Sequence, residues 1–415
     1  MVASTDIKFY VHTNTNAPQL QNAFGCMIDL LDACLVNGFG SQAVATLTTS
    51  GTTATATFGS AHNYLQYQVV KIAGATQTEY NGEHRILTVP NANTITFQLA
   101  SAPSVTTATG TITSSLPQLG WLKPFSATGK AAYRSSNTLL ASRPYLRVVD
   151  ALDPAYTSTY AKYAKVGIVE DMSDIDMMFG VQAPYDSTAP DRNWTATGLG
   201  TTVLNGWSRW YYATSSAGNT AGPDTTAPSN GNRSWILVGN KDYFFILPSL
   251  TSLDTNALSY GFGAFQTLLN TDSANTFLSS TLNYIAANSS FAKGNNTALA
   301  TGLANDLLLL QRKYTNEAIA NNASIISLGV ITNIISGSSN YLATVATTST
   351  IPQSPIFIKE LTNVLRGQIP NFNWLFQIKP YSNLQSFEKN GQIFIAKDVA
   401  AANQSGQIVL KIGDL

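Results

Sequence analysis

The densest group of potential metal ligands in this sequence is the acidic segment EDMSDID at residues 170–176. Asp171, Asp174 and Asp176 could supply carboxylate oxygens to a calcium ion, because hard cations prefer several oxygen ligands. The run begins with Glu170 and lacks both the central glycine and the terminal glutamate of an EF-hand loop. We therefore expect a solvated acidic loop and no metal here, with a calcium site as the alternative.

A second group with chemical potential is the aromatic sequence WSRWYY at residues 207–212. It lies within residues 187–232, a stretch rich in Gly, Pro, Ser and Thr that indicates long surface loops. Exposed aromatic rings form binding platforms, so these rings could stack on sugar rings of a bacterial surface. A strand edge or a contact with a neighbouring subunit is the competing interpretation. The side chains concerned are Trp207, Trp210, Tyr211 and Tyr212.

Signatures of catalysis are weak. His12, His62 and His84 are scattered without the spacing of a zinc site, so we expect packing or hydrogen-bonding roles. No G-x-S-x-G elbow, P-loop or Rossmann fingerprint occurs, and the Gly-x-Gly pairs at 198–200 and 261–263 predict turns. A pair of carboxylates with the spacing of a glycosidase site is neither shown nor excluded, because one sequence does not show which acidic side chains lie close together. We expect no enzyme and no cofactor.

The low and balanced charge of the sequence argues against several classes of function. Charged residues make up 11% of the chain, against roughly 25% in a typical protein, and 23 basic side chains balance 23 acidic ones. Such a surface has no basic field to gather nucleic acid, so we expect no DNA or RNA partner. The start of the chain lacks the pattern of a signal peptide, and no run approaches the ~18 apolar residues of a membrane span. We expect synthesis in a cytoplasm.

Cys26 and Cys34 lie eight residues apart in a helix-like segment. On a helix this spacing is about 12 Å of rise, which is too far for a disulfide. We therefore expect two buried thiols that act as small apolar side chains.

Residues 53–113 read as a complete small β-module. Strand-like runs at 53–58, 68–72, 84–89, 94–99 and 108–112 are separated by turn residues. Asn81-Gly82 is its strongest hairpin signal, because both central residues of such a turn must tolerate positive φ. The remainder predicts a mainly β fold of sandwich or barrel type with a few helices.

Outside the module, the periodicity of apolar residues and the positions of turn residues predict further helices and strands. Residues 22–39 predict a helix, because Met27, Ile28, Leu31, Cys34 and Leu35 form an apolar stripe of period near 3.6. Strands are predicted at 121–125, 130–135, 145–150, 163–170, 341–351 and 353–365. Hairpins are predicted at 234–247, around Gly239-Asn240, and at 392–412, with a turn at 403–406. The run at 297–310 ends in LLLL, which periodicity alone does not classify.

Several segments together resemble a family of uncharacterised virion proteins of tailed phages and prophages. They include IDLLDACLVNGFG (28–40), GWLKPFSATGKAAYRS (120–135), PYLRVVD (144–150), SWILVGNKDYFFIL (234–247), YGFGAF (260–265) and RGQIPNFNW (366–374). The resemblance is good to residue 150, at 234–265 and at 360–415, and poor at 180–232 and 280–350. These motifs carry architecture and no catalytic residue: Arg366-Gly367 and Trp374 are expected to fix a turn and a packing corner.

The resemblance implies a virion structural protein and a discontinuous organisation. Residues 1–43 and 114–250 would form one β-rich domain, with the module inserted at 44–113 and a mainly β region at 251–415. The implied partners are other phage virion proteins, in a symmetric multi-copy assembly. A tail or baseplate position is favoured slightly over capsid decoration. The alternatives are an adhesin that binds host polysaccharide through residues 207–212 and, last, a glycan-degrading enzyme.

Overall fold

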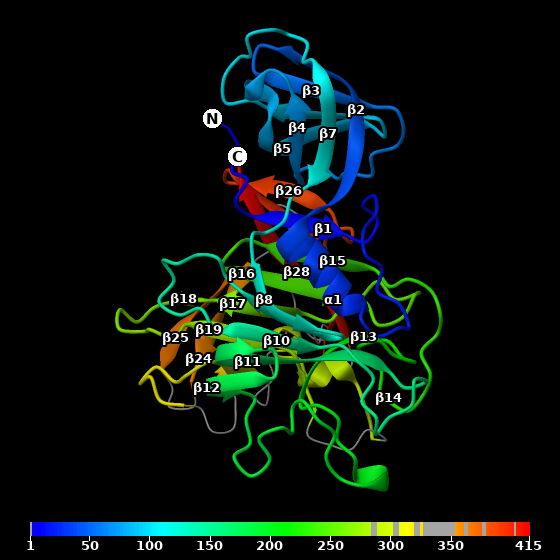
Figure 1. Ribbon diagram of the computed structural model, residues 1–415, viewed down its shortest axis with the longest axis vertical. Helices are drawn as coiled ribbons and strands as arrows, with labels where there is room; N and C mark the ends of the chain where they lie inside the picture. Colours follow the sequence, from blue (N-terminus) through cyan, green and yellow to red (C-terminus); the bar gives the residue numbers. More distant parts are fainter. Residues whose placement is uncertain are drawn as a thin grey trace.

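The computed structural model describes residues 2–283, 289–301, 307–318, 324–326, 353–360, 364–375, 379–401 and 404–415. Over these residues the fold is mainly β with few helices, which confirms the predicted fold class. A small barrel stands on a larger body, and both chain ends lie near their junction (Figure 1). The body is built from two sheets, which we call the long sheet and the short sheet.

The barrel is closed by antiparallel strands in the order β2-β3-β6-β5-β4-β7. Their bounds are β2 (Phe39–Ser50), β3 (Thr53–Phe58), β4 (Val69–Ala75), β5 (Gly82–Asn91), β6 (Thr94–Gln98) and β7 (Gly110–Leu116). Every second residue of β3 is buried, as expected for a strand with one face on a core. The five predicted strands are confirmed, and β2 is an additional one that its polar sequence did not reveal.

The expected hairpin turn at Asn81-Gly82 is wrong. β4 and β5 do pair, but a longer loop that contains the 3-10 turn η2 (Thr78–Tyr80) connects them. The φ of Asn81 is −77°, whereas a type I′ turn needs positive φ at both central residues. The Asn81 side chain instead closes the loop, because its amide bonds both the N–H and the C=O of Ala75, at 3.0 and 2.8 Å.

The body contains the remaining strands. The long sheet runs β1 (Lys8–Val11), β15 (Trp235–Gly239), β16 (Tyr243–Pro248), β17 (Tyr260–Ala264), β19 (Thr276–Ser279), β22 (Leu307–Leu310), β23 (Ser324–Ile326), β24 (Gln353–Lys359), β25 (Leu365–Leu375), β28 (Gln404–Asp414), β27 (Gln392–Ala401) and β26 (Ser386–Lys389), and β18 (Gln266–Thr267) also pairs with β25. The short sheet runs β20 (Thr281–Leu282), β13 (Ser208–Ala213), β11 (Lys162–Asp174), β10 (Tyr145–Val149), β9 (Lys130–Arg134) and β8 (Leu122–Ala127), with β12 (Met177–Ala183) beside β11.

Smaller elements complete the body. They are β14 (Gly222–Pro223) paired with β21 (Ser290–Phe291), the 3-10 turns η3 (Gly200–Thr202) and η4 (Lys293–Asn296), and the helix α2 (Ala298–Thr301).

The long sheet buries both of its faces. On β15, Trp235 and Leu237 join the core shared with the short sheet, whereas Ile236 and Val238 face a second core. That second core is completed by β24, β25, β27 and β28 of the same long sheet. The sheet therefore curls so that its C-terminal strands cover its N-terminal ones, which explains why the 234–247 hairpin is apolar throughout.

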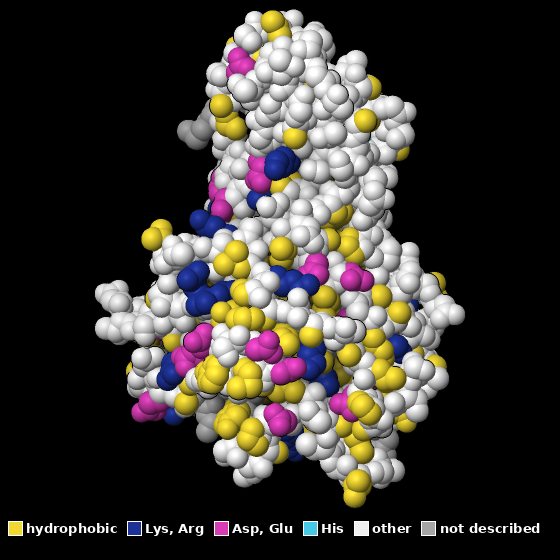
Figure 2. All heavy atoms as spheres, viewed as in Figure 1, with side chains coloured by type: hydrophobic (Ala, Val, Ile, Leu, Met, Phe, Trp, Pro, Cys, Tyr) yellow, Lys and Arg dark blue, Asp and Glu magenta, His cyan; other side chains and the backbone are white. Residues whose placement is uncertain are grey.

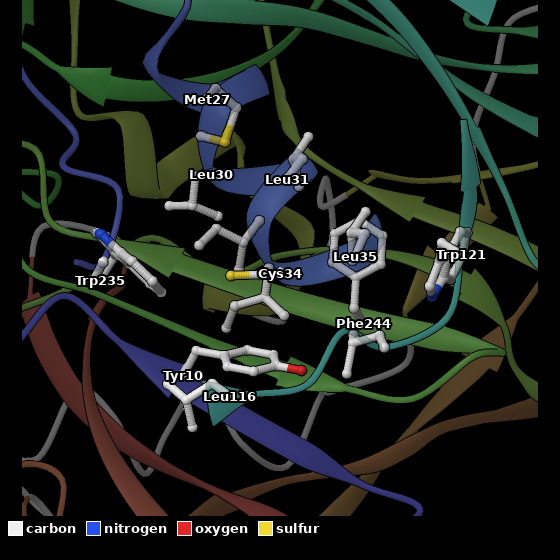
Figure 3. Packing of buried hydrophobic residues seen from close by; sticks show 14 of the residues in the cluster. Tyr10, Met27, Leu30, Leu31, Cys34, Leu35, Leu116, Trp121, Trp235 and Phe244 are labelled. Atoms are coloured by element: carbon white, nitrogen blue, oxygen red, sulfur yellow. The ribbon is translucent and has the colours of Figure 1, made fainter. Parts of the chain in front are cut away.

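The predicted helix is shorter than expected at both ends. It comprises α1 (Cys26–Leu31), which continues as the π-helix η1 (Asp32–Asn37). Gly38 ends it with φ +72°, and a Cβ there would lie 2.7 Å from the Leu116 carbonyl oxygen. The predicted apolar stripe is confirmed, because its five side chains are buried. Figure 3 shows α1 and η1 packed over Tyr10, Trp235 and Phe244.

A buried carboxylate fixes the start of this helix. The Asp150 side chain, which follows β10, accepts hydrogen bonds from the Met27 N–H (2.9 Å) and the Tyr212 hydroxyl (2.7 Å). Burial raises the pKa of Asp150 to about 6, while these hydrogen bonds act in the opposite direction. The short sheet is thereby tied to the N-terminus of α1, where a negative charge is favourable.

Three C-terminal expectations need correction or comment. Within the strand predicted at 353–365, β24 ends at Lys359, neither Glu360 nor Val364 belongs to a strand, and Leu365 begins β25; residues 361–363 lie outside the described residues. Residues 366, 367 and 374 lie inside β25, not in a turn, although Gly367 does permit close packing: a Cβ there would lie 2.6 Å from the Phe265 ring. The strand predicted at 341–351 lies outside the described residues. The LLLL run is strand β22.

The two predicted body hairpins are confirmed by the pairing of β15 with β16 and of β27 with β28. The second turn is placed too late, however, because Gln404 already pairs with Ala401.

The barrel is held on the body by buried polar groups. Arg85 is 2% exposed and donates to three backbone carbonyls, those of Ser4 (2.6 Å), Ile7 (2.9 Å) and Tyr67 (2.7 Å). Gln68 exchanges two hydrogen bonds of 2.9 Å with the side chain of Asn14. The neck contacts with Ser4, Ile7 and Asn14 join the barrel to the N-terminal segment of the body, whereas Tyr67 belongs to the barrel. A buried guanidinium is strongly directional, so they set the orientation of the barrel.

The division of the chain into an inserted module and a host domain stays a prediction, and the pairing of β2 with β7 makes it testable. Ala43 and Thr113 are direct partners across the base of the barrel. Replacing residues 44–112 by Asn-Gly would close these ends as a short hairpin. We expect the shortened chain to unfold in one cooperative thermal transition followed by circular dichroism. A chain without cooperative unfolding would show that the body needs the barrel to fold.

Candidate functional site

A surface pocket of about 130 Å³ opens between loops of the body. It lies beside η3, which Figure 1 shows at the end of the body far from the barrel. The pocket is smaller than the ~300–1,000 Å³ of drug-sized ligand sites, so it fits a small group or the end of a chain. Its lining residues are uncharged: Ala155, Tyr156, Tyr160, Gly200, Thr201, Val203 and Thr225.

Two tyrosines give the pocket its chemistry. The rings of Tyr156 and Tyr160 meet edge to face, with centroids 5.4 Å apart and an interplanar angle of 88°. The Tyr156 hydroxyl donates to the Val203 carbonyl at 3.1 Å, which joins the two sides of the pocket. Burial raises the pKa of Tyr156 to about 12, so the phenol stays protonated at neutral pH. The pocket therefore offers aromatic faces and neutral hydroxyls to a ligand.

A buried ion pair positions the loops that form the pocket. The Asp153 carboxylate accepts the N–H groups of Ala155 and Ala196, both at 3.1 Å, and lies 3.4 Å from the Lys165 ammonium. Lys165 also donates to the carbonyl of Trp194. Burial lowers the pKa of Lys165 to about 8, against the opposing effect of Asp153. Strand β11, which carries Lys165, thus holds in place the loop that contains Asp153 and Ala155 and the loop that contains Trp194 and Ala196.

A fully buried charge cluster lies behind the pocket. Asp224, the neighbour of the lining residue Thr225, pairs with Arg209 of β13 at 2.6 Å and with Lys293 of η4 at 3.1 Å. The Tyr211 hydroxyl donates to the same carboxylate at 2.7 Å. All three charged side chains are at most 1% exposed. Because all three charged side chains are buried, the cluster is not available to a ligand.

The predicted aromatic platform at residues 207–212 is not on the surface. Trp207 is 6% exposed, and Trp210, Tyr211 and Tyr212 are fully buried. Most of the segment is strand β13, which lies between β11 and β20 within the short sheet. Trp210 stacks on Tyr260, with centroids 5.9 Å apart. The prediction that these four residues lie in an exposed loop is therefore wrong. Their rings are buried, and those of residues 210–212 pack in the core between the two sheets.

Sequence reasoning missed Tyr156 and Tyr160. They lie four residues apart in a Pro-, Ser- and Thr-containing stretch directly after β10. Tyrosines in such a stretch indicate exposed rings in a loop, and this signal was available in the sequence.

Two acids of the segment 170–176 are engaged by basic side chains. Glu170 makes a two-pronged ion pair with Arg312, both contacts being 2.7 Å. Asp176 pairs with Lys130 and Arg147 at 2.7 and 2.6 Å. Across the described part of the chain, no three His, Cys, Asp or Glu side chains are placed to hold a metal ion. The segment is also not a loop, because β11 extends to Asp174.

The remaining candidates have structural surroundings. The Nε2 atoms of His62 and His84 donate hydrogen bonds to the backbone carbonyl oxygens of Asn91 and Tyr80, and burial lowers the pKa of each histidine. Cys26 and Cys34 are free thiols, and burial raises the pKa of each. Gly261 and Gly263 belong to strand β17, not to a turn, whereas 198–200 leads into η3. None of the helices among the described residues is both long and apolar enough to cross a membrane.

Comparisons with known proteins identify no family. No family model and no curated protein matches the chain. Among solved structures, the chain is similar to the phage phi92 endosialidase, at 8% identity and a TM-score of 0.15. The alignment covers 90% of this chain and 51% of that one, so the chain spans about half the length of the protein it matches. At this TM-score the match supports no inference about fold or activity.

The charge cluster gives a stability prediction. Asp224→Asn keeps the shape but leaves Arg209 and Lys293 buried without a counter-charge, which costs about 3–5 kcal/mol. Glu317→Gln is the matched control, because its ion pair with Lys313 is exposed and contributes about 0.5 kcal/mol or less. Urea unfolding of both variants measures the difference. Equal losses would show that the cluster does not hold this part of the fold together.

Proposed function

We propose that this protein is a non-enzymatic structural component of a tailed-phage virion, present in multiple copies. The observation that carries the proposal is the fixed attachment of a projecting barrel to a large β-rich body. Arg85 and Gln68 lock the neck through buried hydrogen bonds, so the barrel is a rigid extension of the body. A rigid projection with no charged field suits a protein that packs against fixed neighbours.

The resemblance of several segments to phage virion proteins supports the same proposal. Those segments fall on elements that build the body: β9, β10, the β15–β16 hairpin, β17 and β25. The proposed partners are other virion proteins of the same particle. We favour a position on the tail or baseplate, with capsid decoration as the alternative, because a projecting module suits an exposed appendage.

Labelling of particles tests this proposal. Antibody raised against the isolated protein is applied to purified phage particles encoded together with this chain, and the label is located by electron microscopy. We expect label on the tail. Label on the capsid would overturn the tail position, and particles that contain no copy of the chain by mass spectrometry would overturn the virion function.

A second candidate function is that of an adhesin for host polysaccharide, with the pocket beside η3 as the proposed binding site. The pocket supports it because Tyr156 and Tyr160 present ring faces, and the lining hydroxyls are neutral. The earlier candidates Trp207, Trp210, Tyr211 and Tyr212 cannot act as the platform, since they are buried.

Binding to purified host polysaccharide tests the adhesin function. We expect the double variant Tyr156→Ala, Tyr160→Ala to lose about tenfold in affinity, because two stacking rings are removed. Tyr314→Ala, which removes a half-buried tyrosine that is not in the pocket lining, is the control. Isothermal titration gives both affinities. An unchanged affinity of the double variant would exclude this pocket as the binding site.

A further inference from the structure

A buried lysine without an ion pair lies in the C-terminal part of the body. The molecule carries few charges, as the largely white barrel in Figure 2 illustrates, yet Lys397 of β27 is only 1% exposed. Among the described residues no carboxylate pairs with it, and its neighbour Asp398 pairs instead with Lys379 at 3.1 Å. Burial lowers the pKa of Lys397 to about 8, against the opposing effects of Asp398 and Asp254. Roughly a tenth of these amines are therefore neutral at pH 7, and a neutral amine is a nucleophile.

An amide carbon lies beside this amine. Lys397 Nζ donates to the side-chain oxygen of Asn383 at 3.3 Å, and Asn383 belongs to the loop that precedes β26. The backbone N–H of Asp398 donates to the same oxygen at 3.1 Å. A donor held there stabilises the negative charge that develops on the oxygen when an amine attacks the carbon. The second bond of Nζ, to the Thr255 carbonyl at 2.7 Å, keeps the amine in place.

A carboxylate with a free oxygen lies at the same site. Asp254 is in the loop between β16 and β17, and it acts electrostatically on Lys397. Its Oδ1 accepts the N–H and the side-chain amide of Asn256, at 2.8 and 2.9 Å. Its Oδ2 is buried and has no hydrogen-bond partner among the described residues. Both oxygens of Asp398, by contrast, are engaged by other side chains. Asp254 is therefore the group that can carry a proton here.

We propose that Lys397 and Asn383 react with each other to form an intramolecular isopeptide bond, with Asp254 as the proton carrier. The neutral Nζ attacks Cγ of Asn383, so that an Nζ–Cγ bond forms and the Cγ–Nδ2 bond breaks. Asp254 takes one proton from Nζ and delivers it to Nδ2, which leaves as ammonia. The step is neither an oxidation nor a reduction, and it needs no cofactor. Each chain reacts once, so the protein modifies itself without being an enzyme.

The bond would brace the part of the body that faces the barrel. It joins the loop before β26 to β27, and Figure 1 shows β26 at the junction with the barrel. The barrel contacts this strand directly, because the Tyr67 hydroxyl donates to Glu388 of β26. A covalent bond behind that contact stays closed when hydrogen bonds open. This inference goes beyond the proposed function and does not depend on it.

Intact-mass spectrometry of the full chain, unfolded in denaturant, tests the proposal. We expect a mass lower than that of the sequence by one ammonia per chain. Trypsin should then fail to cut after Lys397, and a branched peptide should join residues 367–389 to residues 390–411. A chain that has its full mass, with Asn383 and Lys397 in separate unmodified peptides, would overturn the proposal.

Three variants locate the reaction. Asn390→Asp is the control, because a succinimide at the exposed Asn390-Gly391 turn also releases ammonia; this variant should still lose one ammonia. Asn383→Ala removes the amide and should keep its full mass. Asp254→Asn cannot carry the proton, so crosslinking should slow by about a hundredfold and freshly purified chain should have nearly its full mass.

Thermal melts show whether each variant is folded. A folded Asp254→Asn chain that is crosslinked to the same extent as the unaltered protein would overturn the role of Asp254. Ammonia loss that persists in Asn383→Ala but disappears in Asn390→Asp would assign the loss to the succinimide and overturn the isopeptide bond. If a variant does not fold, the tryptic peptides of the unaltered protein decide.

Discussion

A guanidinium that is removed from water needs a counter-charge or hydrogen-bond acceptors, and this requirement connects elements of the structure at three distant places. Arg85 fixes the barrel on the N-terminal segment through backbone carbonyls. Arg209 joins β13 to Asp224. Arg366 of β25 binds Asp272 with two bonds of 2.8 and 2.9 Å and Glu360 with one of 2.7 Å. Arg85 and Arg366 connect segments far apart in sequence, whereas Arg209 joins β13 to the loop that follows it. A change in any of these segments leaves a buried charge without its partner.

Several of the sparse charged side chains of the protein, among them Arg85, Arg209 and Arg366, are thus buried inside the fold. Burial of Arg85 lowers its pKa to about 10, and burial opposes the low pKa that Arg366 gives Asp272. These pKa shifts reflect the free-energy cost of removing charged groups from water. Well-aligned hydrogen bonds and ion pairs have to offset this cost. The outer surface that remains is polar and weakly charged. Such a surface has local apolar side chains and a few charges but no strong long-range field.

Burial also explains why residue type alone does not identify a binding site in this protein. Trp210 and Tyr211 have the chemistry of a sugar platform but fill the space between two sheets. Tyr156 and Tyr160 have the same chemistry and are half-buried at an open pocket, because the loop that carries them leaves the short sheet after Asp150. Asp153 and Lys165 hold that loop in place. Exposure, which depends on the neighbouring layer, decides which aromatic residues can bind.

The sequence by itself determined much of the local structure. Period-2 and period-3.6 patterns located β3, β6, β9, β10 and the apolar face of α1, because these depend on neighbouring residues in the chain. It did not predict the polar strand β2, the π-helix η1, the longer loop at Asn81 or the partners of Glu170 and Asp176. Those features depend on residues from other segments: Leu116 beside Gly38, and Arg312 and Arg147 opposite the acidic run. Only the tertiary structure decided which polar and aromatic groups are buried, because burial is set by contacts between distant parts of the chain.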